Sequence, residues 1–461
     1  MARVRILLQR LSHIATFDDA RRELTDADIL VEDACITEVG QGLRPTAVDE
    51  VIDGRGLLAL PGLVNAHQHL YQMSMRTLPE LERSGFVEFL TALLRVTGER
   101  WRAGRFGAKE VYAFSRAALV ESVLGGVTTV ADQQNIFPGA EPEPYMEAAI
   151  RAARDVGVRL HACRGTATLG RRYGGMIDDA MSEEVPDAVR RCRDLIDAYH
   201  DPHPQAMVRV ALAPAGVSAD RLEIFDAFAA LAAEVPQVRL HTHLHHGLDT
   251  QVAQARYRTS PWQVLRERGF ASDRMWAAHV VTGPRAEIPE YAEAGIGVAT
   301  TPAVDLKLGW GLAPVRDLLD AGVSVGAATS GSMVNDGGNL LGDLRVGALA
   351  HRLASPDPQR WLSARELLGM ATRGSAACLG RDDLGAIAPG RSADIACWDL
   401  RGVDRAGVTD PVAALLFTGL STIASLVLVN GRVVVRDGRH QLVDEVETAA
   451  LVREALDLGP L

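Results

Sequence analysis

The sequence has few lysines, no paired cysteines and no long apolar run. Only two of its 48 basic residues are lysines, and the formal net charge is −11, so a nucleic-acid backbone is not an expected partner. The five cysteines are scattered without a C-x-x-C pair, which argues against a disulfide scaffold or a thiolate zinc site. The N-terminus does not resemble a secretory signal, and no stretch is long enough to span a bilayer. We therefore expect a cytoplasmic protein with no nucleic-acid or membrane partner.

The two ends of the chain are rich in short strand patterns separated by turns. Residues 26–40 alternate apolar and polar side chains, and residues 425–438 contain an Asn-Gly pair typical of a hairpin turn. The middle of the chain follows a different pattern. We therefore predict a small β-sandwich domain formed by both termini, from residues 1–60 and 385–461.

Residues 61–384 alternate short apolar runs with long amphipathic helical patterns, which is typical of a parallel sheet covered by helices. The runs number eight, which predicts a (β/α)₈ TIM barrel in the α/β class. A doubly wound sheet is the alternative, but no Gly-rich phosphate turn follows the first strand. The predicted strands are residues 62–67, 127–132, 158–165, 207–214, 238–244, 275–280, 297–300 and 323–330.

Four histidines lie at the carboxyl ends of predicted barrel strands, where active sites of this fold are found. His67 and His69 end the first strand on the same side, His243 ends the fifth, and His279 ends the sixth. Neutral imidazoles converging there suit zinc or iron. Any one of them alone could be a hydrogen-bonded core residue, but four on one face favour a metal site. His241, one step deeper than His243, is expected to support a ligand.

Several segments resemble a known family. PGLVNAHQH (Pro61–His69) resembles the first-strand signature of the metal-dependent amidohydrolase superfamily, and HTH and AAH fall where its later metal ligands fall. LGAIAPGRSADIACWD resembles its C-terminal signature. Over nearly the whole chain, HQHLYQ, TTVADQ, GWGLAPVRD and NDGGNLLGDLR resemble the triazine hydrolases, with 8-oxoguanine deaminases as more distant relatives.

The resemblance implies one Zn²⁺ per chain, or Fe²⁺, held by His67, His69, His243 and His279, with metal-bound hydroxide as the nucleophile. His279 would thereby serve both as a ligand and in catalysis. Binuclear members of the superfamily carry a bridging lysine on the fourth strand, whereas MVRVALAP contains none. A homodimer is also what the resemblance implies.

Two positions depart from the wider family. Where relatives place an acid–base glutamate three residues after the strand-five histidine, this chain has His246, and Ser330 replaces an aspartate after strand eight. A hydroxyl residue at Ser330 agrees with the triazine-hydrolase branch, and the resemblance makes Ser330 a candidate catalytic residue. Histidine can move protons near neutral pH, so we interpret His246 as the acid–base group, although a merely polar role remains the alternative. Strand alternation instead favours His245, and only the family register indicates His246.

The resemblance implies a hydrolase that displaces an amine, chloride or thiolate from a nitrogen heteroaromatic ring. Gln72, Gln133 and Arg164 follow the first three strands and are candidates to contact such a small heteroaromatic substrate, while Trp310 matches a pocket-wall tryptophan that could stack on it. The His246 replacement leaves open a biosynthetic enzyme of secondary metabolism with altered hydrolytic or lyase-type chemistry. A non-catalytic metal-binding member of the family is a third alternative.

Overall fold

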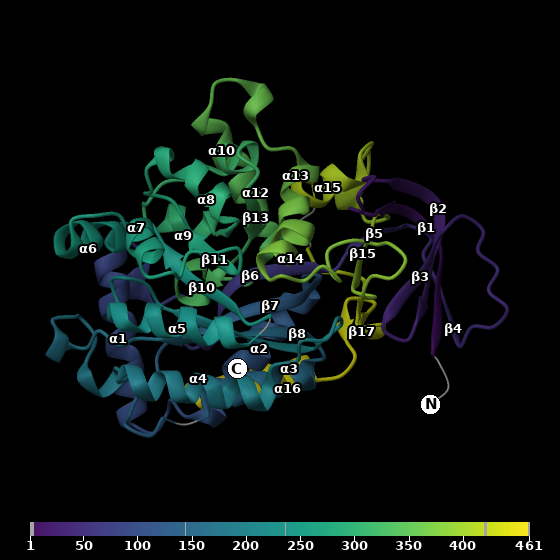
Figure 1. Cartoon of the computed structure of the whole chain (residues 1–461). Helices are drawn as coiled ribbons and strands as arrows, with labels where there is room; N and C mark the ends of the chain where they lie inside the picture. Colours follow the sequence, from purple (N-terminus) through teal and green to yellow (C-terminus); the bar gives the residue numbers. More distant parts are fainter. Residues whose placement is uncertain (1–3, 143, 236, 419–421, 460–461) are drawn as a thin grey trace.

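The computed structural model describes residues 4–142, 144–235, 237–418 and 422–459. These residues form a helix-covered parallel barrel and a separate sheet built from both ends of the chain (Figure 1). The predicted α/β class with a TIM barrel is confirmed, and where a β-sandwich was expected the two termini together form one separate sheet. Over the same residues, no helix combines the length and the apolar character needed to cross a lipid bilayer.

The barrel is a parallel sheet whose eighth strand is interrupted. Ala328 and Thr329 separate the last two segments, of which β13 pairs with β12 and β14 pairs with β6. Because β13 and β14 follow each other directly in the chain, these two pairings close the barrel. The strands are β6 (Leu63–His69), β7 (Val127–Gln134), β8 (Arg159–Thr166), β9 (Val208–Pro214), β10 (Arg239–Leu244), β11 (Met275–His279), β12 (Gly297–Thr300), β13 (Ser324–Ala327) and β14 (Ser330–Gly331).

Helices cover the outside of the barrel, which explains why its strands are almost entirely buried. The α-helices are α1 (Phe86–Arg102), α2 (Ala108–Leu124), α3 (Tyr145–Val156), α4 (Val185–Tyr199), α5 (Leu222–Glu234), α6 (Gly247–Tyr257), α7 (Pro261–Glu267), α8 (Ile288–Ala294), α9 (Pro302–Lys307), α10 (Val315–Asp320), α11 (Ser332–Asn335), α12 (Leu340–Ala350), α13 (Ala364–Gly369), α14 (Ser375–Cys378), α15 (Pro411–Phe417) and α16 (Glu445–Ala455).

The barrel interior is filled by small side chains around one large ring. Alanines and Cys163 surround the buried Trp276, whose Nε1 donates to the carbonyl of Ala66 at 2.9 Å. At the amino-terminal end of the strands, α14 closes the floor of the barrel. Gly297 permits this close approach, because a Cβ there would lie 2.8 Å from Cys378 Sγ.

The terminal sheet joins the barrel through β5, which is followed after one residue by β6. The predicted Asn-Gly hairpin is present between β16 and β17, and Asn430 and Gly431 both have positive φ. This is the geometry of a two-residue hairpin turn. The strands of the terminal sheet are β1 (Arg5–Ala15), β2 (Glu23–Glu32), β3 (Cys35–Gly40), β4 (Glu50–Asp53), β5 (Leu57–Pro61), β15 (Ile395–Asp399), β16 (Leu426–Val429), β17 (Arg432–Arg436) and β18 (Arg439–His440).

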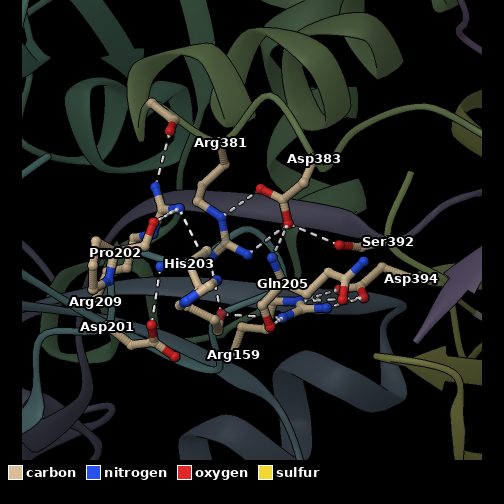
Figure 2. Close-up of polar contacts among 12 residues, drawn as sticks. Arg159, Asp201, Pro202, His203, Gln205, Arg209, Arg381, Asp383, Ser392 and Asp394 are labelled. Carbon is tan, nitrogen blue, oxygen red and sulfur yellow. Dashed lines mark hydrogen bonds and ion pairs between the residues drawn. The ribbon is translucent and has the colours of Figure 1, made fainter. Parts of the chain in front are cut away.

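Buried arginine–aspartate pairs connect the barrel floor to the chain that enters the terminal sheet (Figure 2). Arg159 of β8 donates to both carboxylate oxygens of Asp394, at 3.0 and 2.9 Å. Arg381 donates to both oxygens of Asp383 at 2.8 Å, and Asp383 also accepts from Ser392 Oγ at 2.7 Å. Burial acts to raise the pKa of Asp383, but the Arg381 guanidinium holds that pKa below its usual value. The barrel floor is therefore fixed by mutually satisfied charges.

Candidate metal centre

A cavity of about 110 Å³ opens at the carboxyl ends of the barrel strands, at the end opposite the arginine–aspartate pairs. A single water needs about 10–15 Å³ on this measure, so the space suits a small organic molecule. Its lining is mostly apolar. The side chains that give it chemistry are His69, Gln72, Asn135, Ser218, His243, His246, His279, Trp310 and Ser330.

His67 lies beneath the cavity and is completely buried. Its Nδ1 is 2.9 Å from Nε2 of His241, and the other ring nitrogen of His241 contacts the Trp276 carbonyl at 3.0 Å. His67 Nε2 is buried without a hydrogen-bond partner among the described residues. His241 thus orients His67 and leaves its Nε2 lone pair free, while the role of His241 in supporting a metal ligand stays a prediction.

His69 and His243 are oriented by backbone carbonyls. His69 Nδ1 lies 2.7 Å from the carbonyl oxygen of Gln133, and His243 Nδ1 lies 2.6 Å from that of Ala215. A carbonyl only accepts, so each Nδ1 carries the proton and each Nε2 carries a lone pair. The two Nε2 atoms are 3.3 Å apart. No proton is left to bridge them.

His279 is oriented by a carboxylate that sequence reasoning missed. Its Nδ1 is 2.9 Å from Asp305 Oδ1 and 2.8 Å from Thr301 Oγ1, and the Thr301 hydroxyl donates to the same carboxylate at 3.0 Å. Both partners follow β12, in the segment TTPAVD. The signal that could have found them is a polar group just past a strand end. Again the Nε2 lone pair is left free.

The free lone pairs converge. Ligand nitrogens of His67, His243 and His279 all lie within 4.8 Å of one another, and His69 Nε2 joins them through its 3.3 Å approach to His243. Several lone pairs facing one another in a buried site repel unless a cation lies between them. Tetrahedral zinc takes such nitrogen ligands at about 2.0–2.1 Å. The donor set therefore fits one zinc ion.

The protonation of these rings also suits a metal. Burial, reinforced by the neighbouring histidines, holds the pKa values of His67 and His243 well below the usual value. Burial lowers the pKa of His69 to about 4. Neutral imidazole is the form that binds a metal ion, so these ligands are ready to bind at neutral pH.

The chain turns sharply after β10, and this turn decides which histidine faces the cavity. His246 lines it, whereas His245 is fully buried on the opposite side, 2.7 Å from Glu287. The family register is therefore followed and strand alternation is not. His246 is the N-cap of α6, with Nδ1 accepting from the Asp249 N–H at 3.4 Å. Its proton accordingly resides on Nε2.

Trp310 lines the cavity as predicted, but one of its faces is already covered. His246 stacks on it, with ring centroids 5.4 Å apart and planes inclined by 23°. Phe86 lies 5.0 Å from His246 and 5.1 Å from Trp310. The tryptophan therefore supports His246 with this face, and the stacking of a flat substrate on Trp310 stays a prediction.

Gln72 and Ser330 reach the cavity, as predicted. Gln72 Oε1 is buried and has no hydrogen-bond partner within the described ranges. Ser330 begins β14 with a positive φ of 54°, which places it beside the ring of histidines at the point where the barrel closes. Both residues therefore belong to the cavity wall.

Gln133 and Arg164 do not line the cavity, which corrects their predicted substrate contacts. Gln133 donates from Nε2 to the Ala213 carbonyl at 2.9 Å, and its own carbonyl contacts His69 Nδ1. Arg164 follows the interior residue Cys163 and therefore faces outward. There it pairs with Glu183 at 2.7 Å.

Comparison with known proteins agrees with this site. The Amidohydrolase family model matches residues 58–434. The chain is 33% identical over 450 residues to hydroxydechloroatrazine ethylaminohydrolase of Pseudomonas sp. strain ADP, covering 95% of this chain and 92% of that protein. It is 32% identical over 427 residues to 8-oxoguanine deaminase of Pseudomonas aeruginosa, covering 92% of each.

Comparison with solved structures also finds similarity to hydrolases of heteroaromatic compounds. Atrazine chlorohydrolase from Arthrobacter aurescens TC1, crystallised with zinc, is 53% identical, with a TM-score of 0.96 over 98% of this chain and 100% of that one. A triazine hydrolase variant superposes with a TM-score of 0.97 at 53% identity, covering 98% of this chain and 99% of that one. With a family model matching most of its length, this chain belongs to the amidohydrolase family.

Proposed function

We propose that this protein is a zinc-dependent hydrolase that replaces an amine, chloride or thiolate on a nitrogen heteroaromatic ring by hydroxyl. Relatives that hydrolyse carbon–nitrogen or carbon–chlorine bonds of such rings support it. In the overall reaction, the oxygen of water bonds to the ring carbon, the bond to the substituent breaks, and the substituent leaves with a proton.

The observation that carries the proposal is the set of free Nε2 lone pairs beside the cavity. His67, His69, His243 and His279 would hold one zinc, which when bound supplies the Lewis acidity that activates water near neutral pH. β9 contains no lysine, so the bridging group of a binuclear site is missing from that strand. One metal per chain is therefore expected.

The cavity favours a flat, weakly polar substrate. Phe86, Phe89, Leu90 and Leu93 form an apolar wall, which would favour burial of a planar ring over a polyanion. The Gln72 side chain supplies a carbonyl oxygen that can read an N–H on the ring edge. No arginine or lysine is among the residues that line the cavity in the described part of the chain, so a phosphorylated substrate would lack its usual clamp.

His246 is proposed to be a proton donor in the hydrogen-bonding sense, stabilising developing negative charge through its Nε2–H without losing that proton. Its Nδ1 is engaged by the helix cap, so its Nε2–H faces the cavity, where ring nitrogen or the departing group gains negative charge during substitution. Burial, with His279 and His245 nearby, lowers its pKa well below the usual value. It is therefore a neutral hydrogen-bond donor before the reaction.

The test is a substrate panel on the zinc-loaded protein. It compares atrazine, 8-oxoguanine, isoxanthopterin and 5′-deoxyadenosine, which represent the chemistry of the relatives, with an acyclic amide and a nucleotide. Product mass and released chloride or ammonia are measured. We expect turnover of at least one free heteroaromatic compound. Turnover confined to the acyclic amide or the nucleotide would contradict the proposal.

A further inference from the structure

Two consecutive histidines follow β10 and point in opposite directions. On a continuing strand, His245 would lie on the same side as His243. The strand instead ends at Leu244, and His245 adopts a left-handed conformation with φ 55°. Non-glycine residues seldom occupy this region unless their surroundings hold them there. The turn therefore requires a specific cause.

The side chain of His245 supplies that cause, because both of its ring nitrogens are engaged. Nε2 lies 2.7 Å from Glu287 Oε2, and Nδ1 lies 3.2 Å from Thr250 Oγ1. The same Glu287 oxygen accepts from the Tyr291 hydroxyl at 2.8 Å. Gly283 makes room for the ring, since a Cβ there would lie 2.8 Å from His245 Cδ2. The ring is anchored in a fitted, buried position.

The backbone of His245 ties the end of β10 to the end of β11. Its carbonyl accepts from the N–H groups of Val281 at 3.2 Å and Thr282 at 2.9 Å, and from the Thr282 hydroxyl at 2.9 Å. The two donor residues, Val281 and Thr282, come just after His279 in the sequence. One residue thus fixes two loops that border the cavity.

We infer that His245, anchored by Glu287, is a positioning residue that turns the chain so that His246 faces the cavity. The inference rests on the proposed role of His246 as proton donor. His245 itself does not line the cavity. Its effect on the reaction passes through the orientation of its neighbour, which Trp310 and the α6 cap then complete.

The test is a double-mutant cycle. His245→Ala and Glu287→Gln are each made in the wild-type and the His246→Ala backgrounds, and kcat and KM are measured with atrazine and 8-oxoguanine. In the wild type we expect kcat to fall about ten- to hundredfold with little change in KM, as a displaced catalytic group would cause. In the His246→Ala background we expect no further fall, because the two effects share one cause.

Two further variants separate anchoring from general stability. His245→Gly adopts the left-handed turn without strain, so it should retain more of kcat than His245→Ala. Asp394→Asn weakens a buried ion pair at the barrel floor, far from the cavity, and should lower the melting temperature while leaving kcat unchanged. Zinc content is measured for every variant. If His245→Ala does not fold, the same kinetic comparison is made with Glu287→Gln alone.

The outcomes are distinguishable. Equal losses in the wild-type and His246→Ala backgrounds would overturn the positioning inference alone. A His246→Ala protein with normal kcat would overturn the proposed donor role and the inference with it. A crystal structure of Glu287→Gln adds a readout independent of activity. The inference predicts a displaced His246 ring there, and an unchanged ring beside a lowered kcat would contradict it.

Discussion

The two ends of the barrel use buried polar residues in opposite ways. At the floor, Arg159 and Arg381 each meet a carboxylate through two hydrogen bonds. At the mouth, four histidines are each bonded through Nδ1, and their Nε2 lone pairs face one another. The paired charges of these two arginines fix the floor. The converging lone pairs at the mouth mark a place where a metal ion fits.

The difference explains where each end can tolerate change. Breaking a buried ion pair leaves an uncompensated charge and costs stability. Removing one converging histidine relieves repulsion between lone pairs but destroys the metal site. Mutations at the floor should therefore act on folding, and mutations at the mouth should act on metal binding and turnover.

The largest effect is expected at the mouth. His243→Ala should lose bound zinc and all measurable turnover, because a ligand at the centre of the cluster is removed. Metal analysis and the substrate panel measure both. His203→Ala, an exposed histidine near the floor, is the matched control and should retain both. Normal turnover of His243→Ala would contradict the assignment.

The second-largest effect is expected from removing a buried ion pair at the barrel floor. Asp394→Ala should lower the free energy of unfolding by about 3–5 kcal/mol, since it leaves the Arg159 guanidinium buried without its partner. Denaturant unfolding measures the change. The folded fraction should keep its zinc and its kcat. Loss of zinc from folded Asp394→Ala protein would show that the two ends are not independent.

Removing the proposed proton donor, His246, should reduce turnover less than removing a metal ligand does. His246→Ala should lower kcat about a hundredfold while leaving zinc content intact. The restored family residue provides the converse, because His246→Glu should improve turnover of atrazine if the chain has kept triazine-type chemistry. Steady-state kinetics with metal analysis decide both. Unchanged turnover in His246→Ala would transfer the role to bound water.

The smallest effect is expected one contact away from the ligands. Asp305→Ala should weaken zinc binding about ten- to hundredfold, because Asp305 orients His279 through Nδ1. Competition with a chelator measures the affinity. Asp317→Ala, which removes a half-buried carboxylate paired with Arg285 and Arg360, should leave zinc affinity unchanged. Equal affinities in the two variants would contradict the orienting role of Asp305.

Local patterns in the sequence were sufficient to predict the barrel and the histidines that cluster at the ends of its strands. Each apolar run and each strand-end histidine is encoded within a few residues, so alternation and spacing locate it. The same alternation places Arg164 outside the barrel once Cys163 is known to face inward. That second step needs the register of the strand, which the sequence does not state.

Other features depend on contacts between distant segments. The reversal at His245 is held by Glu287, 42 residues away, and no local pattern predicts it. The stacking of Trp310 on His246 likewise joins two separate loops. The Asp305 contact with His279 depends on how the segment after β12 folds back over β11. Long-range contacts set the orientation of the side chains in the site, whereas local sequence patterns determine which strand ends carry them.

The lone pairs at the mouth are proposed to bind a single zinc ion. The most direct measurement is a calorimetric titration of zinc into metal-free protein, checked by elemental analysis of the purified product. We predict one tightly bound zinc per chain in the wild type and none in His67→Ala. Two ions per chain, no stoichiometric ion, or full binding by His67→Ala would contradict the account.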